Sequence, residues 1–154
     1  MHVIAAKATC FQEAGKSDFI DYQKQVKSNA HALATALSAF GFKVVSGGTD
    51  NHLLLIDLRP SHPEITGKDA QLALEGANLT LNRNTVPGET RSPFQTSGLR
   101  IGTPAVTTRG MKEAEMEIIA AIISVSLKNP NDASSIGFQK EKSLALCTKF
   151  PLPY

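Results

Sequence analysis

Apolar residues recur at three- and four-residue steps near the start of the chain, a spacing typical of amphipathic helices. Residues 3–14 are rich in alanine and predict a first helix that ends near Gly15. Ser17 has the side chain of a helix N-cap, and the apolar positions after it predict a second helix that ends at Gly41. The first quarter of the chain is therefore predicted to be almost entirely helical.

Short apolar runs bounded by turn residues predict the strands of a small sheet. These runs lie at 42–45, 53–58, 78–81 and 99–102. The second run is apolar on both faces, which favours a central position in the sheet.

Further helices are predicted over 66–76, 111–128 and 132–148. Thr66 and Asp69 match a capping box, and Thr103-Pro104 combines an N-cap with proline at the first helical position. On the helix 111–128 we expect one apolar face, which consists of Ala114, Ile118, Ile122 and Val125. Helices that alternate with short strands predict an α/β fold, an α+β two-layer domain in which a small sheet is packed with helices.

The composition fits one globular domain, with 154 residues, a formal net charge of +2 and 19% charged residues. Interspersed charges and few aromatic residues argue against a nucleic-acid or membrane surface. No apolar run approaches the roughly 18 residues of a membrane span, and Lys7 comes too early for a signal peptide. Cys10 and Cys147 form no CxxC motif, so we expect a reduced, cytoplasmic setting, with Cys10 as a small core residue. The four histidines show no metal-ligand spacing.

Arg100 is the strongest candidate for binding chemistry. Its neighbours in the predicted strand share one face, whereas Arg100 points to the other. A helix is expected to begin at Thr103-Pro104, with free backbone N–H groups and the positive end of the helix dipole. A guanidinium beside such a helix end suits a carboxylate or a phosphate. The alternative is a structural ion pair of Arg100 with Asp57 or Glu64.

The stretch 82–97 has no strand or helix period and contains two proline turns. Such a long segment without secondary structure is uncommon in a compact domain and is usually functional or disordered. Asn82 and Asn84 offer amide donors and acceptors for the edge of a heterocycle, and Ser92-Pro93-Phe94 can lie against an aromatic ligand. A surface loop of turn residues is the alternative, and the residues by themselves favour it.

A glycine-rich turn, Gly47 to His52, joins two predicted strands. It is not a GxGxxG pattern followed by a helix, so a dinucleotide site is only weakly indicated. Asp50 and His52 are candidates for an acid/base pair. A tight connection, in which Asp50 and Asn51 bond to the local backbone, is the favoured interpretation.

Four segments then stand out in order along the chain: MHVIAAKA, AFGFKVVSGGTDNHLLLIDL, LNRNTVPGETRSPFQTSGLRIGTPAVTTRG and LALCTKFPLP. Together they resemble serine hydroxymethyltransferase of the bacterial type, and GTDNHL and SGLRIGTPAVTTRG are the most specific. This family is a fold-type I pyridoxal 5'-phosphate (PLP) enzyme that interconverts serine and glycine, with tetrahydrofolate as one-carbon acceptor. The resemblance covers only the C-terminal part of that enzyme. It implies a remnant of the large PLP domain at 1–15, a long connecting helix at 16–41 and the small C-terminal domain at 42–154.

The resemblance also implies roles for individual residues. Arg100 matches the arginine that holds the carboxylate of serine or glycine. Asn84 matches a residue that contacts the tetrahydrofolate ring system, and Ser92, Pro93 and Phe94 match a loop that lines the folate site. The implied partners are serine or glycine, tetrahydrofolate, and either a separate N-terminal half or further copies of the chain.

The PLP-binding residues of the family have no match here. None of the eleven lysines lies in the family's threonine-rich His-Lys motif, and the aspartate, histidine and glutamate that serve the cofactor are also missing. The first Met corresponds to a position shortly after the Schiff-base lysine. We therefore expect that this chain alone binds no cofactor productively and does not turn over serine. The resemblance assigns no role to Asp50 or His52.

Three interpretations stay open. The chain is a truncated hydroxymethyltransferase that is inactive alone, a non-enzymatic module that binds anions and folate, or a half that complements a separately encoded N-terminal half. Residues 1–15 are apolar enough to suit burial against the missing domain. We therefore expect an exposed apolar patch, with fraying or self-association.

Overall fold

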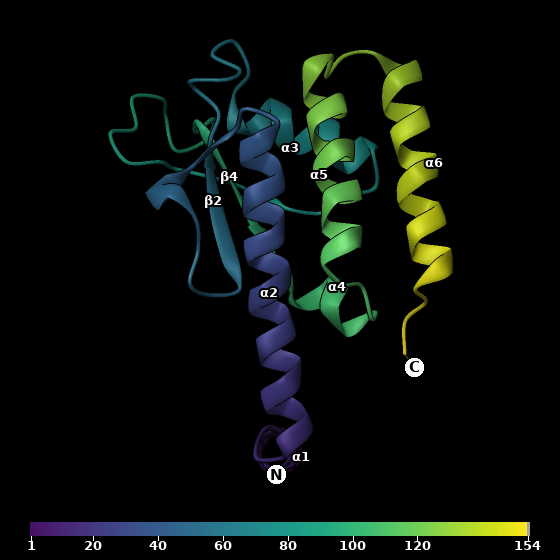
Figure 1. Ribbon diagram of the computed structural model, residues 1–154. Helices are drawn as coiled ribbons and strands as arrows, with labels where there is room; N and C mark the ends of the chain where they lie inside the picture. Colours follow the sequence, from purple (N-terminus) through teal and green to yellow (C-terminus); the bar gives the residue numbers. More distant parts are fainter. Residues whose placement is uncertain (154) are drawn as a thin grey trace.

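A computed structural model describes residues 1–153, in which six α-helices and four strands form one small α/β domain (Figure 1). The helices are α1 (His2–Ala14), α2 (Ser17–Ala39), α3 (Gly67–Gly76), α4 (Pro104–Thr108), α5 (Glu113–Lys128) and α6 (Ala133–Lys149). The strands are β1 (Lys43–Val44), β2 (Leu53–Asp57), β3 (Asn82–Asn84) and β4 (Gly98–Gly102), and a 3₁₀ turn covers Val45–Gly47. The two-layer α/β class expected from the sequence is confirmed.

The strands pair in the order β1-β2-β4-β3, and every pair is antiparallel. The strand β2 is central, as its apolar run predicts. The register places Leu55 opposite Arg100, and Arg100 opposite Asn82. Because side chains alternate along a strand, the apolar residues of one face are buried while Arg100 is exposed on the other.

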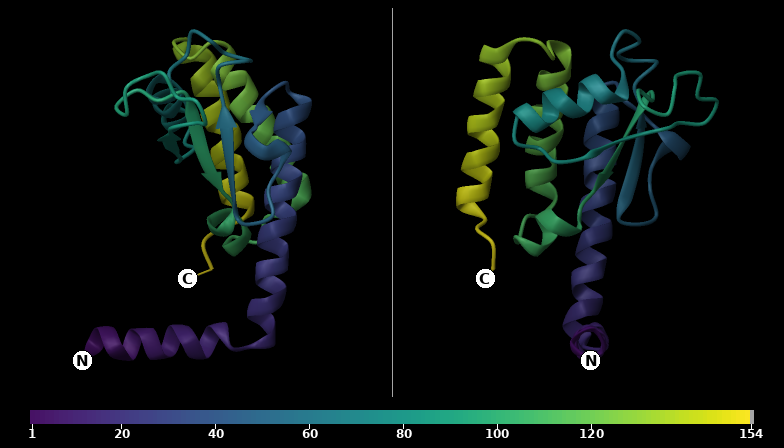
Figure 2. Two further views of the ribbon diagram at one scale, coloured as in Figure 1. Left: turned by 90° about the vertical axis from the view of Figure 1, so that its left-hand side faces the viewer. Right: turned by 180° about the vertical axis from the view of Figure 1, so that it is seen from behind.

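One face of the sheet carries the core and is covered by α2, α3 and α5, while α6 lies along the outer side of α5 (Figures 1 and 2). The core is made of buried apolar side chains from the sheet and these helices, among them Leu33, Leu37, Ile56, Leu74, Leu99 and Ile123. Fully burying each side chain of this size contributes roughly 2 kcal/mol. The opposite face of the sheet has no helix over it.

A buried amide ties the helical layer together. The side chain of Asn29 on α2 is fully buried, and its Nδ2 donates to Thr107 Oγ1 at 2.8 Å and to the Met111 carbonyl at 3.0 Å. Thr103 was expected to cap α4 with its side chain, but its hydroxyl donates to the Val26 carbonyl at 2.8 Å instead. These bonds fix α4 against α2, because a buried polar group without a partner is costly.

The third strand lies later in the chain than predicted. The sequence indicated 78–81, whereas β3 is Asn82–Asn84, inside the stretch expected to be a loop. Asn78 adopts the left-handed conformation (φ 63°), and the Leu79 N–H bonds back to the Leu74 carbonyl, so α3 ends in a tight turn. The chain becomes extended only after that turn.

The buried face of α5 was also predicted wrongly in part. Ile122 is buried, but Ala114 and Ile118 are exposed and Val125 is half-buried. The helix packs against α2 on one side and α6 on another, so its buried residues occupy a wider arc than a single stripe. At the N-terminus, Lys16 rather than Ser17 is the N-cap of α2, and Ser17 is the first helical residue.

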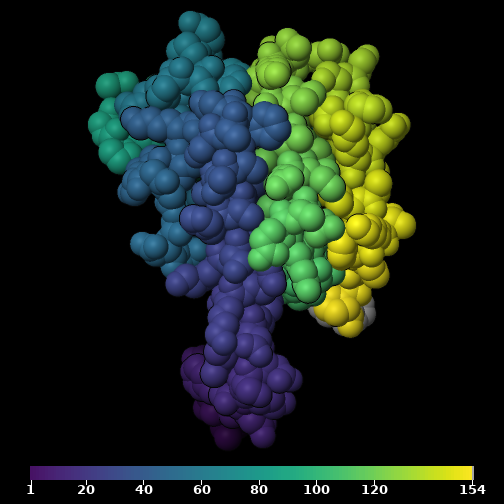
Figure 3. All heavy atoms as spheres, viewed as in Figure 1, coloured from purple at the N-terminus to yellow at the C-terminus, as the bar shows by residue number. Residues whose placement is uncertain are grey.

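The first helix forms an arm that the rest of the domain does not cover. No residue of α1 is buried, and it projects at a steep angle from the end of α2 (Figure 2). Val3, Ile4 and Phe11 are 53%, 64% and 73% exposed. Figure 3 shows that the arm joins the body of the domain through a narrow stem. Cys10, expected in the core, is exposed on this arm. The expected exposed apolar patch is confirmed, and self-association stays a prediction. None of the helices among residues 1–153 is long and apolar enough to span a bilayer.

Candidate functional site

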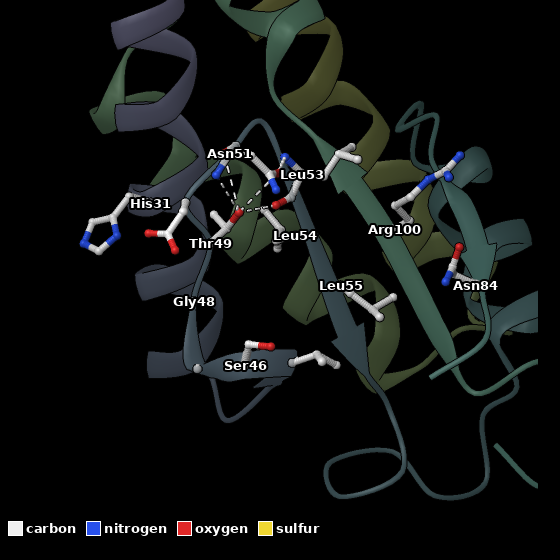
Figure 4. A pocket seen from close by; sticks show the side chains of 13 residues that line it. His31, Ser46, Gly48, Thr49, Asn51, Leu53, Leu54, Leu55, Asn84 and Arg100 are labelled. Atoms are coloured by element: carbon white, nitrogen blue, oxygen red, sulfur yellow. Dashed lines mark hydrogen bonds between the residues drawn. The ribbon is translucent and has the colours of Figure 1, made fainter. Parts of the chain in front are cut away.

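The open face of the sheet carries a basin of about 620 Å³ beside Arg100. Its floor is formed by β2, through Leu53 and Leu55, and its rim by the turn that contains Gly48 (Figure 4). Asn84 from β3 and Arg100 from β4 form the opposite wall. The structure therefore brings together two residues that lie sixteen positions apart in the sequence and were singled out separately.

The guanidinium of Arg100 has no carboxylate partner among the described residues. Its Nη2 donates to Asn82 Oδ1 at 3.2 Å, and no salt bridge of the described residues includes Arg100. Asp57, one suggested partner, binds Arg59 at 2.9 Å and Lys43 at 3.6 Å instead. The hydrogen bond from Arg59 is the main cause that lowers the pKa of Asp57, and the charges of Arg59 and Lys43 add to it. Burial acts in the opposite direction and is outweighed. The structural ion pair is therefore excluded, and the guanidinium is available to an anion.

The prediction that Arg100 lies beside the N-terminus of α4 is wrong. The start of α4 packs on the helical side, where the Tyr22 hydroxyl donates to the Pro104 carbonyl at 3.2 Å. No residue of α4 lines the basin. Arg100 points to the open face, whereas Thr103 bonds to the Val26 carbonyl on the helical side, where the chain continues into α4. An anion at Arg100 would then meet only side chains of the open face, without a helix dipole.

Loop 85–97, which joins β3 to β4, is closed by the carboxylate of Glu89. Its Oε1 accepts from the N–H groups of Thr90 and Arg91, both at 3.0 Å, and from the Ser97 hydroxyl at 2.7 Å. Its Oε2 accepts from the Ser97 N–H at 2.8 Å. Burial raises the pKa of Glu89, but the bonds from Ser97 and the two other amides outweigh it and lower the pKa to about 2.

Two arginines fix the same loop to the body of the domain. Arg59 donates to the carbonyls of Pro87 and Gly88 at 2.8 and 2.7 Å while it holds Asp57. Arg91 donates to the Ile65 carbonyl at 2.8 Å and to the Pro63 carbonyl at 2.5 Å. Loop 85–97 is therefore a tethered structure, although its sequence shows no period.

The first turn of α3 holds the end of the loop. The N–H groups of Gly67 and Lys68 donate to the carbonyls of Thr96 and Gln95, both at 3.0 Å. This close approach requires glycine at 67, because a Cβ there would lie 2.7 Å from the Gly98 carbonyl oxygen. The capping box of Thr66 and Asp69, predicted from the sequence, is confirmed and sets the direction of this helix end.

The residues matched to a folate site differ in how close they lie to the basin, and only Asn84 lines it. Asn84 is half-buried and donates to the Thr85 carbonyl at 2.8 Å, and it lines both the basin and an adjoining hollow of about 430 Å³. Pro93 lines only the hollow, and Ser92 contributes its carbonyl to the N–H groups of two later loop residues. Phe94 lines neither and is 78% exposed. The loop therefore presents this ring to solvent.

The turn at Gly47 to His52 is a tight connection, as expected, but of Asp50 and Asn51 only Asn51 bonds to the local backbone through its side chain, whereas the Asp50 side chain has no hydrogen bond among the described residues. Asn51 Oδ1 accepts from the Leu53 N–H at 2.7 Å, and Thr49 also bonds to the backbone of Leu53. Asp50 and His52 are both exposed and have no bond to each other. Within residues 1–153, no three His, Cys, Asp or Glu side chains gather as metal ligands.

A family model for serine hydroxymethyltransferase matches residues 1–123 of the chain. The match includes the exposed arm, the whole sheet and most of α5, and it ends before α6. It therefore covers every residue of the basin and of loop 85–97.

The residues of the basin do not fit PLP. The cofactor needs a lysine amine for its Schiff base, and no lysine is among the side chains that line the basin. The positive charge of Arg100 is suited to an anionic group but supplies no covalent attachment. Sequence reasoning missed Glu89, Arg59 and Arg91, although charged residues within a turn-rich stretch were the available signal.

Glu89→Gln should destabilise the domain at pH 7 by on the order of 2 kcal/mol, because it weakens several charge-assisted hydrogen bonds. The pKa of Glu89 is lower in the folded protein, so the carboxylate stabilises the fold above its ordinary value near 4.5. This contribution is lost as the pH falls from there towards 2. Urea unfolding should therefore show a difference between wild type and variant that shrinks over this range.

The exposed Glu64→Gln is the matched control and should unfold like the wild type at pH 7. A Glu89→Gln variant as stable as wild type at pH 7 would show that the carboxylate does not hold the loop.

Proposed function

The chain belongs to the serine hydroxymethyltransferase family, and on that basis we propose that it supplies the C-terminal wall of a site for serine–glycine interconversion. The family reaction uses PLP and passes one carbon to tetrahydrofolate. In this proposal residues 1–15 belong to the large PLP domain, 16–41 connect the two domains, and 42–154 form the small domain. The setting proposed for this reaction is the cytoplasm.

The observation that carries the proposal is a free guanidinium beside a fixed loop. Arg100 stands on the uncovered face of the sheet without an acidic partner among residues 1–153, and its strand neighbour Asn82 already orients the guanidinium. Two parallel N–H···O bonds from such a group bind a carboxylate in one plane. Arg100 would thereby hold the amino acid by its acid group and set which bonds of its α-carbon face the reacting cofactor.

Asn84 and loop 85–97 would form the neighbouring folate contact. Asn84 lies between the basin and the adjoining hollow, so a ligand in the hollow would stand next to an amino acid bound at Arg100. The tethers from Glu89, Arg59 and Arg91 fix the loop before a ligand arrives, which lowers the entropic cost of binding. Phe94 would then meet the ring system from the exposed side.

The basin is too open to retain these ligands without a second wall. Small-molecule sites bury most of the ligand surface, whereas this face of the sheet is uncovered and Phe94 is largely exposed. The exposed arm α1 favours the interpretation that this chain works with a separate N-terminal half. The chain by itself is then proposed to be inactive.

The isolated chain should form no stoichiometric Schiff base when it is mixed with PLP and desalted, and it should not turn over serine with tetrahydrofolate. The reason is that no lysine lines the basin. Absorption spectroscopy and a one-carbon transfer assay measure both properties, with an intact bacterial serine hydroxymethyltransferase as the positive control. A stable stoichiometric band together with turnover would refute the proposal.

When this chain is combined with the N-terminal half of a bacterial family member, activity should appear, and Arg100→Lys should raise the KM for serine roughly 30-fold or more. Lysine keeps the charge but loses the planar fork that binds a carboxylate in two places. Arg83→Lys is the matched control, since Arg83 lies on the neighbouring strand and bonds to Gln71 of α3 at 3.5 Å. An equal KM for both variants would show that Arg100 does not hold the substrate.

A further inference from the structure

A second cavity, of about 290 Å³, lies on the helical side of the sheet between α4, α5 and α6. It shares no lining residue with the basin. Its walls are mainly apolar side chains from the sheet, α5 and α6, among them Leu81, Ile101, Met116, Ile123 and Leu146. An apolar space of this kind is where a ligand gains most from leaving water.

Two buried hydroxyl groups, of Thr103 and Ser143, interrupt this apolar wall, and only that of Thr103 has a partner. Ser143 of α6 lines the cavity and is 3% exposed, and its Oγ has no hydrogen-bond partner among the described residues. Buried hydroxyls in folded proteins nearly always have a partner, so the Oγ of Ser143 lacks the hydrogen bond that folding normally supplies. Residues of α6 lie beyond the part of the chain that the family model matches.

The charged group at the cavity, the guanidinium of Arg109, already has hydrogen-bond partners. Arg109 is its one ionised lining residue, and it donates from Nε to the Phe150 carbonyl at 2.8 Å and from Nη2 to the Cys147 carbonyl at 2.9 Å. These bonds hold the last turn of α6, where carbonyls lack helical partners. An uncharged ligand therefore suits the cavity better than an anion.

We propose that this cavity binds a compact, neutral and mostly apolar molecule with one hydrogen-bonding group directed to Ser143. A cavity of about 150 Å³ lined by apolar side chains is known to bind benzene. The cavity here is about twice as large, which matches a bicyclic aromatic molecule. This site is independent of the amino acid and folate site proposed on the open face.

The two cysteines of the chain allow a direct test with indole as the probe. Cys147 lines the cavity and is half-buried, whereas Cys10 is exposed on α1. Indole in the cavity should slow alkylation of Cys147 by iodoacetamide several-fold and leave Cys10 unchanged. Mass spectrometry of the intact wild-type chain follows both sites in one sample, so Cys10 serves as the internal reference.

A plugging variant tests the location of the probe. Ala105 is exposed at the mouth of the cavity, and Ala105→Trp should abolish the protection of Cys147 by filling that mouth. Ala114→Trp is the matched control, at an exposed position on α5 that does not line the cavity, and it should keep the protection.

The role of Ser143 is tested by comparing indole with 1-methylindole, which lacks the N–H donor. The wild type should prefer indole by roughly fivefold, the worth of one neutral hydrogen bond, and Ser143→Ala should lose that preference. Unchanged alkylation of Cys147 at the solubility limit of indole would overturn the proposal. Equal protection in Ala105→Trp, or an equal preference in Ser143→Ala, would do the same.

Discussion

The carboxylate of Glu89 holds together the loop on which the open face of the sheet depends. Loop 85–97 connects β3 to β4, and these two strands carry Asn84 and Arg100. Closing a long connection costs conformational entropy, and that cost falls on the pairing of the strands it joins. The bonds from Glu89 to both N–H and hydroxyl of Ser97 return the chain to the start of β4. The relative position of the two site residues therefore follows from one half-buried acid.

The two faces of the sheet have separate tasks. One face gives its apolar side chains to the core under α2, α3 and α5, and this supplies the stability of the domain. The other face keeps Arg100 in solvent, and an arginine remains charged in any such setting. Because strand residues alternate between faces, the five residues of β4 contribute both to the buried core and to the exposed face.

The sequence predicted the elements whose signals are local. The capping box at Thr66, the C-terminal ends of α3 and α5, and the central place of β2 follow from neighbouring residues, and each is confirmed. The resemblance read from the sequence agrees with the family match. The single residue Arg100 was correctly placed on the exposed side of its strand because alternation requires no tertiary knowledge.

What the sequence failed to predict depends on contacts between distant segments. The tethers from Arg59 to Gly88 and from Arg91 to Pro63 join residues that are 29 and 28 positions apart, and no periodic pattern records them. The prediction that the Thr103 side chain caps α4 was wrong for a related reason. Its hydroxyl donates to the carbonyl of Val26, on a distant helix, and not to its own helix. Cys10 lies on an exposed arm because no other part of the chain covers α1.

The most direct test of this account is amide hydrogen exchange of the isolated chain, measured by NMR without any ligand. If Glu89 fixes the loop in advance, the N–H of Ser97 should exchange as slowly as the N–H groups that pair β2 with β4. Exchange of the Ser97 N–H at the rate of an unprotected loop, beside a protected sheet, would contradict it.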